Sequence, residues 1–221
     1  MLGFDQICVG GLPGVGSVGK VAADYLGVAL DSQTVATILS SGFPPQVMVD
    51  EGLVHIFRVE INAPQERPDL IILTGDAQPL DIGGMYSLAG EILSQARDLG
   101  AGLMITMAAY VGASKHKVLG VASDAELARS LDDAGVHLLK TGFIGGLNGL
   151  LVGMAPSYGL KGLCLLGSTS GDLPVDIEAA CNLLEVVARL LDLEIALDGL
   201  TLCSDEEGLE PEPQEFDINY R

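Results

Sequence analysis

Apolar residues along this chain follow two alternating patterns. Short apolar runs, typical of buried strands, occupy residues 5–10, 33–39, 69–74, 103–109, 118–122, 136–139 and 162–166. Apolar residues at helical spacing occupy residues 16–26, 84–99, 123–135 and 144–155, and a last helix is expected to begin at Leu173-Pro174. Strands that alternate with helices predict an α/β protein, a three-layer sandwich with a mostly parallel central sheet.

One stretch departs from this alternation. Residues 47–49 and 53–59 are apolar and flank a short loop, Asp50-Glu51-Gly52. Two such runs joined by a loop that contains glycine predict a β-hairpin. Because a hairpin is antiparallel, the sheet is expected to be mixed.

Helix starts are signalled by short polar side chains. Asp81 precedes one helical pattern and is expected to cap it. Ser123 and Glu126 form a capping-box pattern before another. The helix expected over residues 144–155 is unusual because it holds Gly145, Gly146, Gly149 and Gly153. Glycine costs about 1 kcal/mol at each helix position, so these glycines predict close packing against another backbone.

Composition narrows the class of protein. The chain of 221 residues is 48% hydrophobic but only 5% aromatic, with a mean hydropathy of +0.41. An excess of aliphatic residues suits a parallel sheet that is buried on both faces, and it leaves apolar surface that self-association would cover. The longest uncharged run, residues 141–160, is broken by Asn148 and Pro156, which argues against a membrane span. No signal peptide is recognisable, so a cytoplasmic protein is expected.

The net charge and the arrangement of potential metal-binding residues argue against further classes of protein. The net charge is −19, with 11 basic against 30 acidic residues, which argues against binding to nucleic acid. Cys8, Cys164, Cys181 and Cys203 form no CxxC pair and are predicted to be reduced. Single, widely spaced histidines stand at His55, His116 and His137. The sequence therefore predicts no metal site and no cofactor.

A glycine-rich turn leads from the first strand into the first helix. Gly14, Gly16 and Gly19 match GxGxxG, and Lys20 completes GxxxxGK. Both fingerprints are incomplete, because Val21 stands where a P-loop needs Ser or Thr and no acid ends the second strand. Two interpretations stay open: a phosphate-binding turn, as in a nucleotide-binding or ATP-dependent ligase-like enzyme, or a tight turn that packs on the sheet.

Other polar groups near expected strand ends give no complete catalytic set. Asp50-Glu51 and Asp76 could serve as acids or bases, and residues 168–172, Ser-Thr-Ser-Gly-Asp, could accept a phosphate. For both groups, the interpretation as loop and helix caps is favoured over a catalytic or phosphate-binding role. Asn148 could be a polar switch or a ligand donor, but a hydrogen bond to a neighbouring turn or subunit is favoured. No GxSxG elbow and no Ser/His/Asp set is present, so no catalytic residue is predicted.

The chain divides into a body and a tail. Residues 1–200 are predicted to form a single α/β domain, and residues 201–221 an acidic, flexible tail with seven acidic side chains. Phe216, Ile218 and Tyr220 alternate near the terminal carboxylate of this tail. A partner's pocket could capture such an end; an ordinary frayed terminus is the alternative.

Four segments, in order along the chain, resemble the proteasome assembly chaperone 2 (PAC2) family, and its archaeal members most. They are GLPGVGSVGKVAADYL, FPPQVMVDEGLV, ILTGDAQP and GLNGLLVGMAPSYGLKGLCLLGST. The resemblance covers about residues 5–195. It implies one α/β domain similar to purine nucleoside phosphorylases, a phosphorylase/hydrolase-like fold, without their catalytic residues. It also implies a homo-oligomer that binds the α subunits of the proteasome core particle.

Several members of this family carry a C-terminal hydrophobic-Tyr-any tripeptide that inserts between neighbouring α subunits. By this resemblance, the docking tyrosine is Tyr220 and the terminal carboxylate belongs to Arg221. Asn219 departs from the pattern, because a hydrophobic residue is expected there and Ile218 stands one place earlier. The predicted partner-docking residues are therefore Ile218, Asn219, Tyr220 and Arg221.

Overall fold

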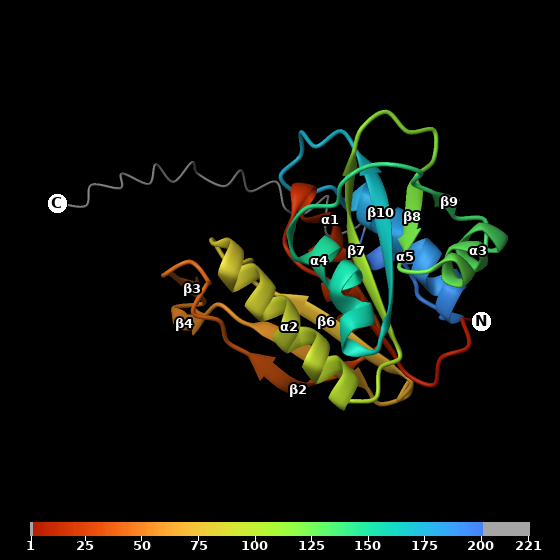
Figure 1. Cartoon of the computed structure of the whole chain (residues 1–221). Coiled ribbons are helices and arrows are strands. Elements are labelled where there is room, and N and C mark those ends of the chain that lie inside the picture. The colour runs from red at the N-terminus through yellow and green to blue at the C-terminus, as the bar shows by residue number, and fades with distance from the viewer. Residues whose placement is uncertain (1, 201–221) are drawn as a thin grey trace.

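The computed structural model describes residues 2–200, and an eight-stranded mixed sheet forms its centre (Figure 1). The strands lie in the order β2-β5-β6-β1-β7-β10-β8-β9. Their bounds are β1 Ile7–Gly11, β2 Ser32–Ile38, β5 Val59–Pro64, β6 Leu70–Gly75, β7 Leu103–Val111, β8 Val118–Ala122, β9 His137–Leu138 and β10 Lys161–Thr169. The remaining strands, β3 Val47–Asp50 and β4 Leu53–Ile56, form a separate hairpin.

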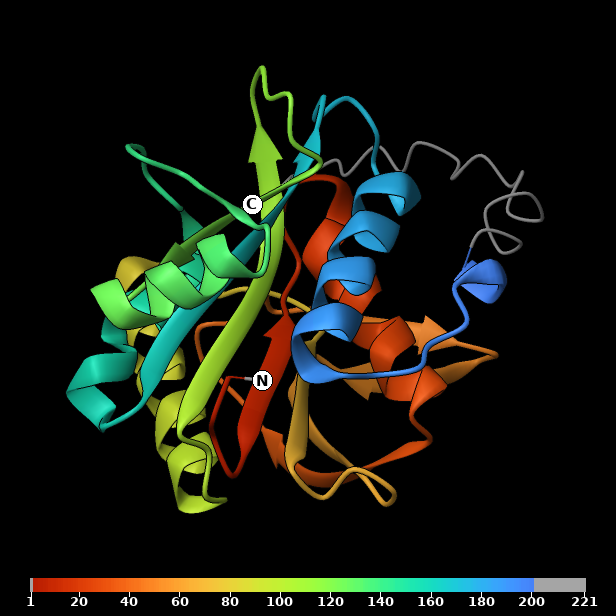
Figure 2. The same ribbon diagram turned by 90° about the vertical axis from the view of Figure 1, so that its right-hand side faces the viewer.

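Helices cover both faces of the sheet, which makes three layers (Figures 1 and 2). On one face, α1 (Val18–Ala29) and α5 (Ile177–Leu191) share a core that also takes in α3 (Ala125–Asp133). On the other face, α2 (Ile82–Asp98) and α4 (Gly146–Met154) pack over a second core. Two short 3-10 turns, η1 (Val15–Ser17) and η2 (Ala155–Tyr158), precede α1 and follow α4. The predicted fold class is confirmed.

The middle of the sheet is parallel and the edges are mixed. Strands β6, β1, β7 and β10 run parallel to one another. All five residues of β1 are buried, as expected for a strand covered on both faces. Antiparallel pairing enters where β5 pairs with β2 and β6, and where β8 pairs with β10.

The hairpin differs from the prediction in one respect. Residues 53–59 were expected to form a single strand, but β4 ends at Ile56 and Val59 begins β5, which enters the main sheet. Val59 and Ile61 are fully buried there, whereas most of β4 is exposed. The mixed character of the sheet therefore comes from β5 and β8, and the hairpin lies outside it. Its turn uses Glu51 and Gly52, both with positive φ, which suits a tight hairpin.

Three helix starts can be compared with their predicted caps. Asp81 caps α2 as expected, since its carboxylate accepts from the Gly84 N–H at 2.9 Å. The predicted capping box at Ser123 is wrong: Asp124 caps α3 through two backbone N–H groups. The helix expected from Leu173 begins only at Ile177, because Asp176 accepts from the Ala179 N–H at 2.9 Å.

The glycines of α4 serve different purposes. A Cβ on Gly149 would overlap the carbonyl oxygen of Ile144, so close packing is required there. Gly153 has open space where a Cβ would lie, so no packing compensates for its helix cost. The predicted close packing holds for the first of these positions and is wrong for the second.

Met1 and the predicted tail, residues 201–221, lie outside the described residues. The division at residue 200 therefore stays a prediction. Over residues 2–200, no helix has both the length and the apolar character needed to cross a bilayer.

Candidate functional site

A crevice opens at the carboxyl ends of β1 and β7, where the chain connections diverge. After β1, the chain passes through α1 to β2 on one side of the sheet, whereas after β7 it continues toward β8 on the other. Open α/β sheets bind ligands at such a switch point. A cavity of about 460 Å³ lies here, between the glycine-rich turn before α1 and the loop before α4.

Two amide side chains form hydrogen bonds with the backbone of segments that line this cavity. Asn148 is 4% exposed; its Oδ1 accepts from the Leu12 N–H and its Nδ2 donates to the Leu12 carbonyl, both at 3.0 Å. Gln78 donates to the Pro13 carbonyl and accepts from the Leu147 N–H at 2.9 Å. Of the roles considered for Asn148, the structure supports the bond to a neighbouring turn.

The glycine-rich turn packs tightly on the sheet. Gly16 and Ser17 adopt positive φ angles of 58° and 47°. A Cβ on Gly19 would overlap the Met107 carbonyl, so this glycine lets the start of α1 touch β7. Lys20 pairs with Asp24 at 2.9 Å, one turn along α1. To reach a phosphate at the turn, Lys20 would have to leave that ion pair; phosphate binding by Gly14, Gly16, Gly19 and Lys20 stays a prediction.

The lining of the switch-point cavity has no charged side chain. Tyr110 is its one ionisable group, and its larger side chains are otherwise apolar or amide. General acid–base catalysis needs a titratable group with a pKa near the working pH. The cavity therefore suits binding better than proton transfer.

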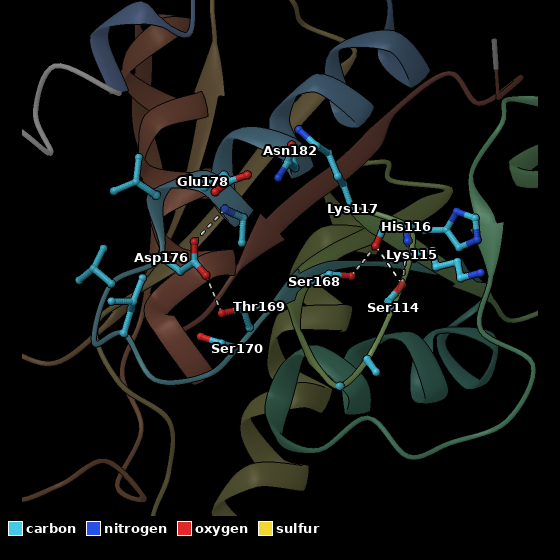
Figure 3. Close-up of a pocket in the computed structure, with 16 residues that line it drawn as sticks. Ser114, Lys115, His116, Lys117, Ser168, Thr169, Ser170, Asp176, Glu178 and Asn182 are labelled. Atoms are coloured by element: carbon cyan, nitrogen blue, oxygen red, sulfur yellow. Dashed lines mark hydrogen bonds between the residues drawn. The ribbon is translucent and has the colours of Figure 1, made fainter.

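A second cavity, of about 710 Å³, lies between the β7–β8 loop and the start of α5 (Figure 3). Ser168, Thr169 and Ser170, from the segment considered above as a phosphate loop, line it. The Thr169 hydroxyl donates to Asp176 at 2.5 Å, and the Ser168 hydroxyl donates to the His116 carbonyl at 2.7 Å (Figure 3). The hydroxyls that could bind a phosphate thus support the loop and the helix cap instead.

Two of the three histidines meet in space, which their sequence separation did not predict. The rings of His116 and His137 stack with centroids 3.5 Å apart. Within residues 2–200, no group of three or more His, Cys, Asp or Glu side chains could hold a metal ion. Burial raises the pKa of Cys8 and Cys164 to about 12, which keeps these thiols protonated.

The acidic candidates are separated by the fold. Asp50 and Glu51 lie at the exposed tip of the hairpin. Asp76 follows β6, where its Oδ2 accepts from the Arg58 N–H at 3.1 Å. Asp76 therefore supports a loop, as one of the two interpretations held.

The hairpin carries an aliphatic face that sequence reasoning missed. Cross-strand pairs place Val47 beside Ile56 and Val49 beside Val54, so these four side chains share one face. Their exposed fractions are 52%, 53%, 68% and 70% in the order Val47, Ile56, Val49 and Val54. We call this set the hairpin face. The alternating aliphatic residues Val47 and Val49 on one arm, and Val54 and Ile56 on the other, were the signal, but period-2 alternation alone does not say whether a face is covered.

Further exposed apolar side chains lie at the start of α2 and just before it. The loop before β3 contacts the start of α2, where the Leu80 N–H donates to the Gly42 carbonyl at 2.9 Å (Figure 1). Leu80 and Ile82 are 74% and 79% exposed. Exposed apolar patches mark sites of protein–protein contact, so the hairpin face is a candidate contact surface. The predicted docking residues Ile218, Asn219, Tyr220 and Arg221 fall outside the described residues.

Comparison with known proteins agrees with this geometry. The PAC2 family matches residues 8–207. A crystal structure of PbaB from Pyrococcus furiosus, an archaeal proteasome activator, has a TM-score of 0.82 at 31% identity, covering 92% of this chain and 90% of PbaB. PbaA from the same organism, an archaeal homolog of proteasome-assembly chaperone, has a TM-score of 0.79 at 30% identity, over 91% of this chain and 84% of PbaA.

The chain also has a relative at the level of sequence. An uncharacterized protein of Methanocaldococcus jannaschii is 34% identical over 202 residues, which cover 89% of this chain and 78% of that protein. The fold, the four sequence segments and these matches agree over nearly the whole body. The chain belongs to the PAC2 family.

Proposed function

We propose that this chain is a proteasome assembly chaperone-like protein, a non-enzymatic homo-oligomer of the cytoplasm that binds the α subunits of the proteasome core particle. Membership of the PAC2 family and the likeness to PbaA and PbaB support a chaperone-like function. Within the structure, the exposed hairpin face is the observation that carries the homo-oligomeric part of the proposal, because exposed aliphatic surface favours contact with another protein chain.

The hairpin face is assigned to self-association. An isolated two-stranded hairpin is marginally stable in water, and this one leaves the four aliphatic side chains of the hairpin face more than half exposed. A second copy of the chain would cover that face with its own. This assignment agrees with the surplus of aliphatic residues in the composition.

The C-terminal residues are assigned to the α subunits. Tyr220 would bury its ring and bond through its hydroxyl, while the carboxylate of Arg221 would pair with a lysine of the partner. Ile218 would occupy the apolar position that Asn219 does not fill. Several tails on one oligomer would bind by avidity, so each contact can be weak and the chaperone can leave.

Binding of the full-length chain to archaeal proteasome α subunits tests the role of the tail. Deletion of residues 219–221 and the substitution Tyr220→Ala are both expected to weaken binding at least about tenfold, the equivalent of 1.4 kcal/mol. Asn219→Leu restores the hydrophobic-Tyr-any pattern and is expected to strengthen binding by a similar factor. Equal binding by all four chains would refute the tail as the docking element.

Sedimentation of hairpin variants tests self-association separately. Val49→Asp with Val54→Asp places two charges on the hairpin face and is expected to dissociate the oligomer. Met48→Asp with His55→Asp is the matched control, because these residues form the next cross-strand pair on the opposite face. An oligomer that survives the first pair, or is lost equally with both, would contradict the assignment.

A further inference from the structure

The switch-point cavity has a chemical character unlike the rest of the molecule. The chain carries a net charge of −19, yet no charged side chain lines this cavity. The amides of Gln78 and Asn148 already bond to backbone groups of the surrounding loops. What the cavity offers a ligand is therefore apolar surface with few polar groups.

Aromatic and aliphatic side chains are among those that line the cavity. Phe143, in the loop before α4, is fully exposed and stands at the rim beside Ile144. Tyr110, at the end of β7, also lines the cavity, and its hydroxyl has no hydrogen-bond partner among residues 2–200. An exposed phenylalanine is costly in water, and a ligand bound in the cavity against its ring would cover it.

The position and size of the cavity also fit a ligand site. It lies where α/β sheets bind ligands, at the divergence of connections between β1 and β7. Its volume of about 460 Å³ falls within the usual range for small-molecule sites, roughly 300–1,000 Å³. A charged ligand would lose its hydration without gaining a countercharge from the lining.

We propose that this cavity binds a small, uncharged molecule with a flat apolar body, held against Phe143 and Tyr110. A single polar group on that molecule would bond to the Tyr110 hydroxyl. This site shares no residue with the hairpin face or with the predicted docking residues 218–221, so it does not depend on the proposed chaperone function.

Two probes that share one ring skeleton test the proposal on the full-length chain. The neutral probe is N-phenyl-1-naphthylamine, and the charged probe is 8-anilinonaphthalene-1-sulfonate. The chain has no tryptophan, so protein fluorescence interferes little. The neutral probe is expected to bind at least about tenfold more tightly than the sulfonate, because the lining has no cation to pair with it.

Glycines on opposite walls allow the cavity to be filled without strain. Gly14 has an extended backbone, and the nearest atom to an added Cβ is 3.9 Å away. Gly145 is also extended and has open space around a Cβ. Gly14→Leu and Gly145→Leu are each expected to weaken binding of the neutral probe at least about tenfold. Gly153→Leu is the matched control, since Gly153 has open space but does not line the cavity.

The outcomes decide the proposal. Loss of neutral-probe binding in both filled variants, with retention in the Gly153 control and in the Val49→Asp, Val54→Asp chain, supports it. Unfolding curves measured in parallel show whether the filled variants keep the fold. Absence of neutral-probe binding, sulfonate binding that is equal or tighter, or unchanged binding in folded filled variants would each overturn it.

Discussion

The two hydrogen bonds between the Asn148 side chain and the Leu12 backbone, here called the clasp, give the sharpest test of the structure. Asn148 lies in α4 and bonds both backbone groups of Leu12, which follows β1 and is fully buried. Asn148→Leu removes both bonds and leaves one buried N–H and one buried carbonyl without partners. Each unsatisfied group costs about 1–3 kcal/mol, and the added apolar burial offsets part of this. We expect a loss of about 3 kcal/mol in the free energy of unfolding.

Asn148→Asp separates the chemistry of the clasp from its shape. The carboxylate has nearly the same shape and can accept from the Leu12 N–H, but it cannot donate to the Leu12 carbonyl. It would also place an unpaired charge at a position that is 4% exposed. The cost is therefore expected to equal or exceed that of Asn148→Leu.

Urea unfolding at one fixed protein concentration measures these differences, since self-association makes stability depend on concentration. Thr106→Val is the graded control, because it removes one bond of 2.9 Å, from the Thr106 hydroxyl to the Asn148 carbonyl. Its expected cost is about 1 kcal/mol. Costs below about 1 kcal/mol for both Asn148 variants, or a milder effect of aspartate than of leucine, would refute this account of the clasp.

Three further predictions concern the body. Gly19→Ala forces a Cβ against the Met107 carbonyl and should lower the free energy of unfolding by about 1–3 kcal/mol. Gly153→Ala should raise it by up to about 1 kcal/mol, because its Cβ meets open space. Urea unfolding measures both changes, and the same sign for both would contradict the packing. The Cys8 thiol, with a pKa of about 12, should resist iodoacetamide at pH 8 in the folded chain, as peptide mass analysis would reveal. A hydrogen bond from Arg67 lowers the pKa of Asp69, so the pair stabilises the fold above about pH 4 and this contribution is lost as the pH falls further. Asp69→Asn should therefore cost at most about 1 kcal/mol at pH 7 and progressively less as the pH falls below about 4, and a cost that does not decrease in acid would contradict the assignment.

Local periodicity of apolar residues was enough to predict most of the helices and strands. A strand or helix has a repeat of its own, so the apolar positions of residues 103–109 or 84–99 reveal the element without its partners. The cap at Asp81 was equally local, since it bonds an N–H three residues away. Four segments in family order were enough to indicate the PAC2 family and its fold. The sequence alone also implied apolar surface to spare, without a place for it.

Only the tertiary structure decided which segments meet. Asn148 finds its partner 136 residues earlier in the chain, and no local pattern encodes such a distance. The strand from Val59 to Pro64 pairs within the main sheet because its partners β2 and β6 bury it, whereas the similar apolar residues of the hairpin face stay exposed. Periodicity shows which side chains share a face, but burial depends on what packs against that face. For the same reason, the uncharged cavity between β1 and β7 emerged only once the strand order brought its walls together.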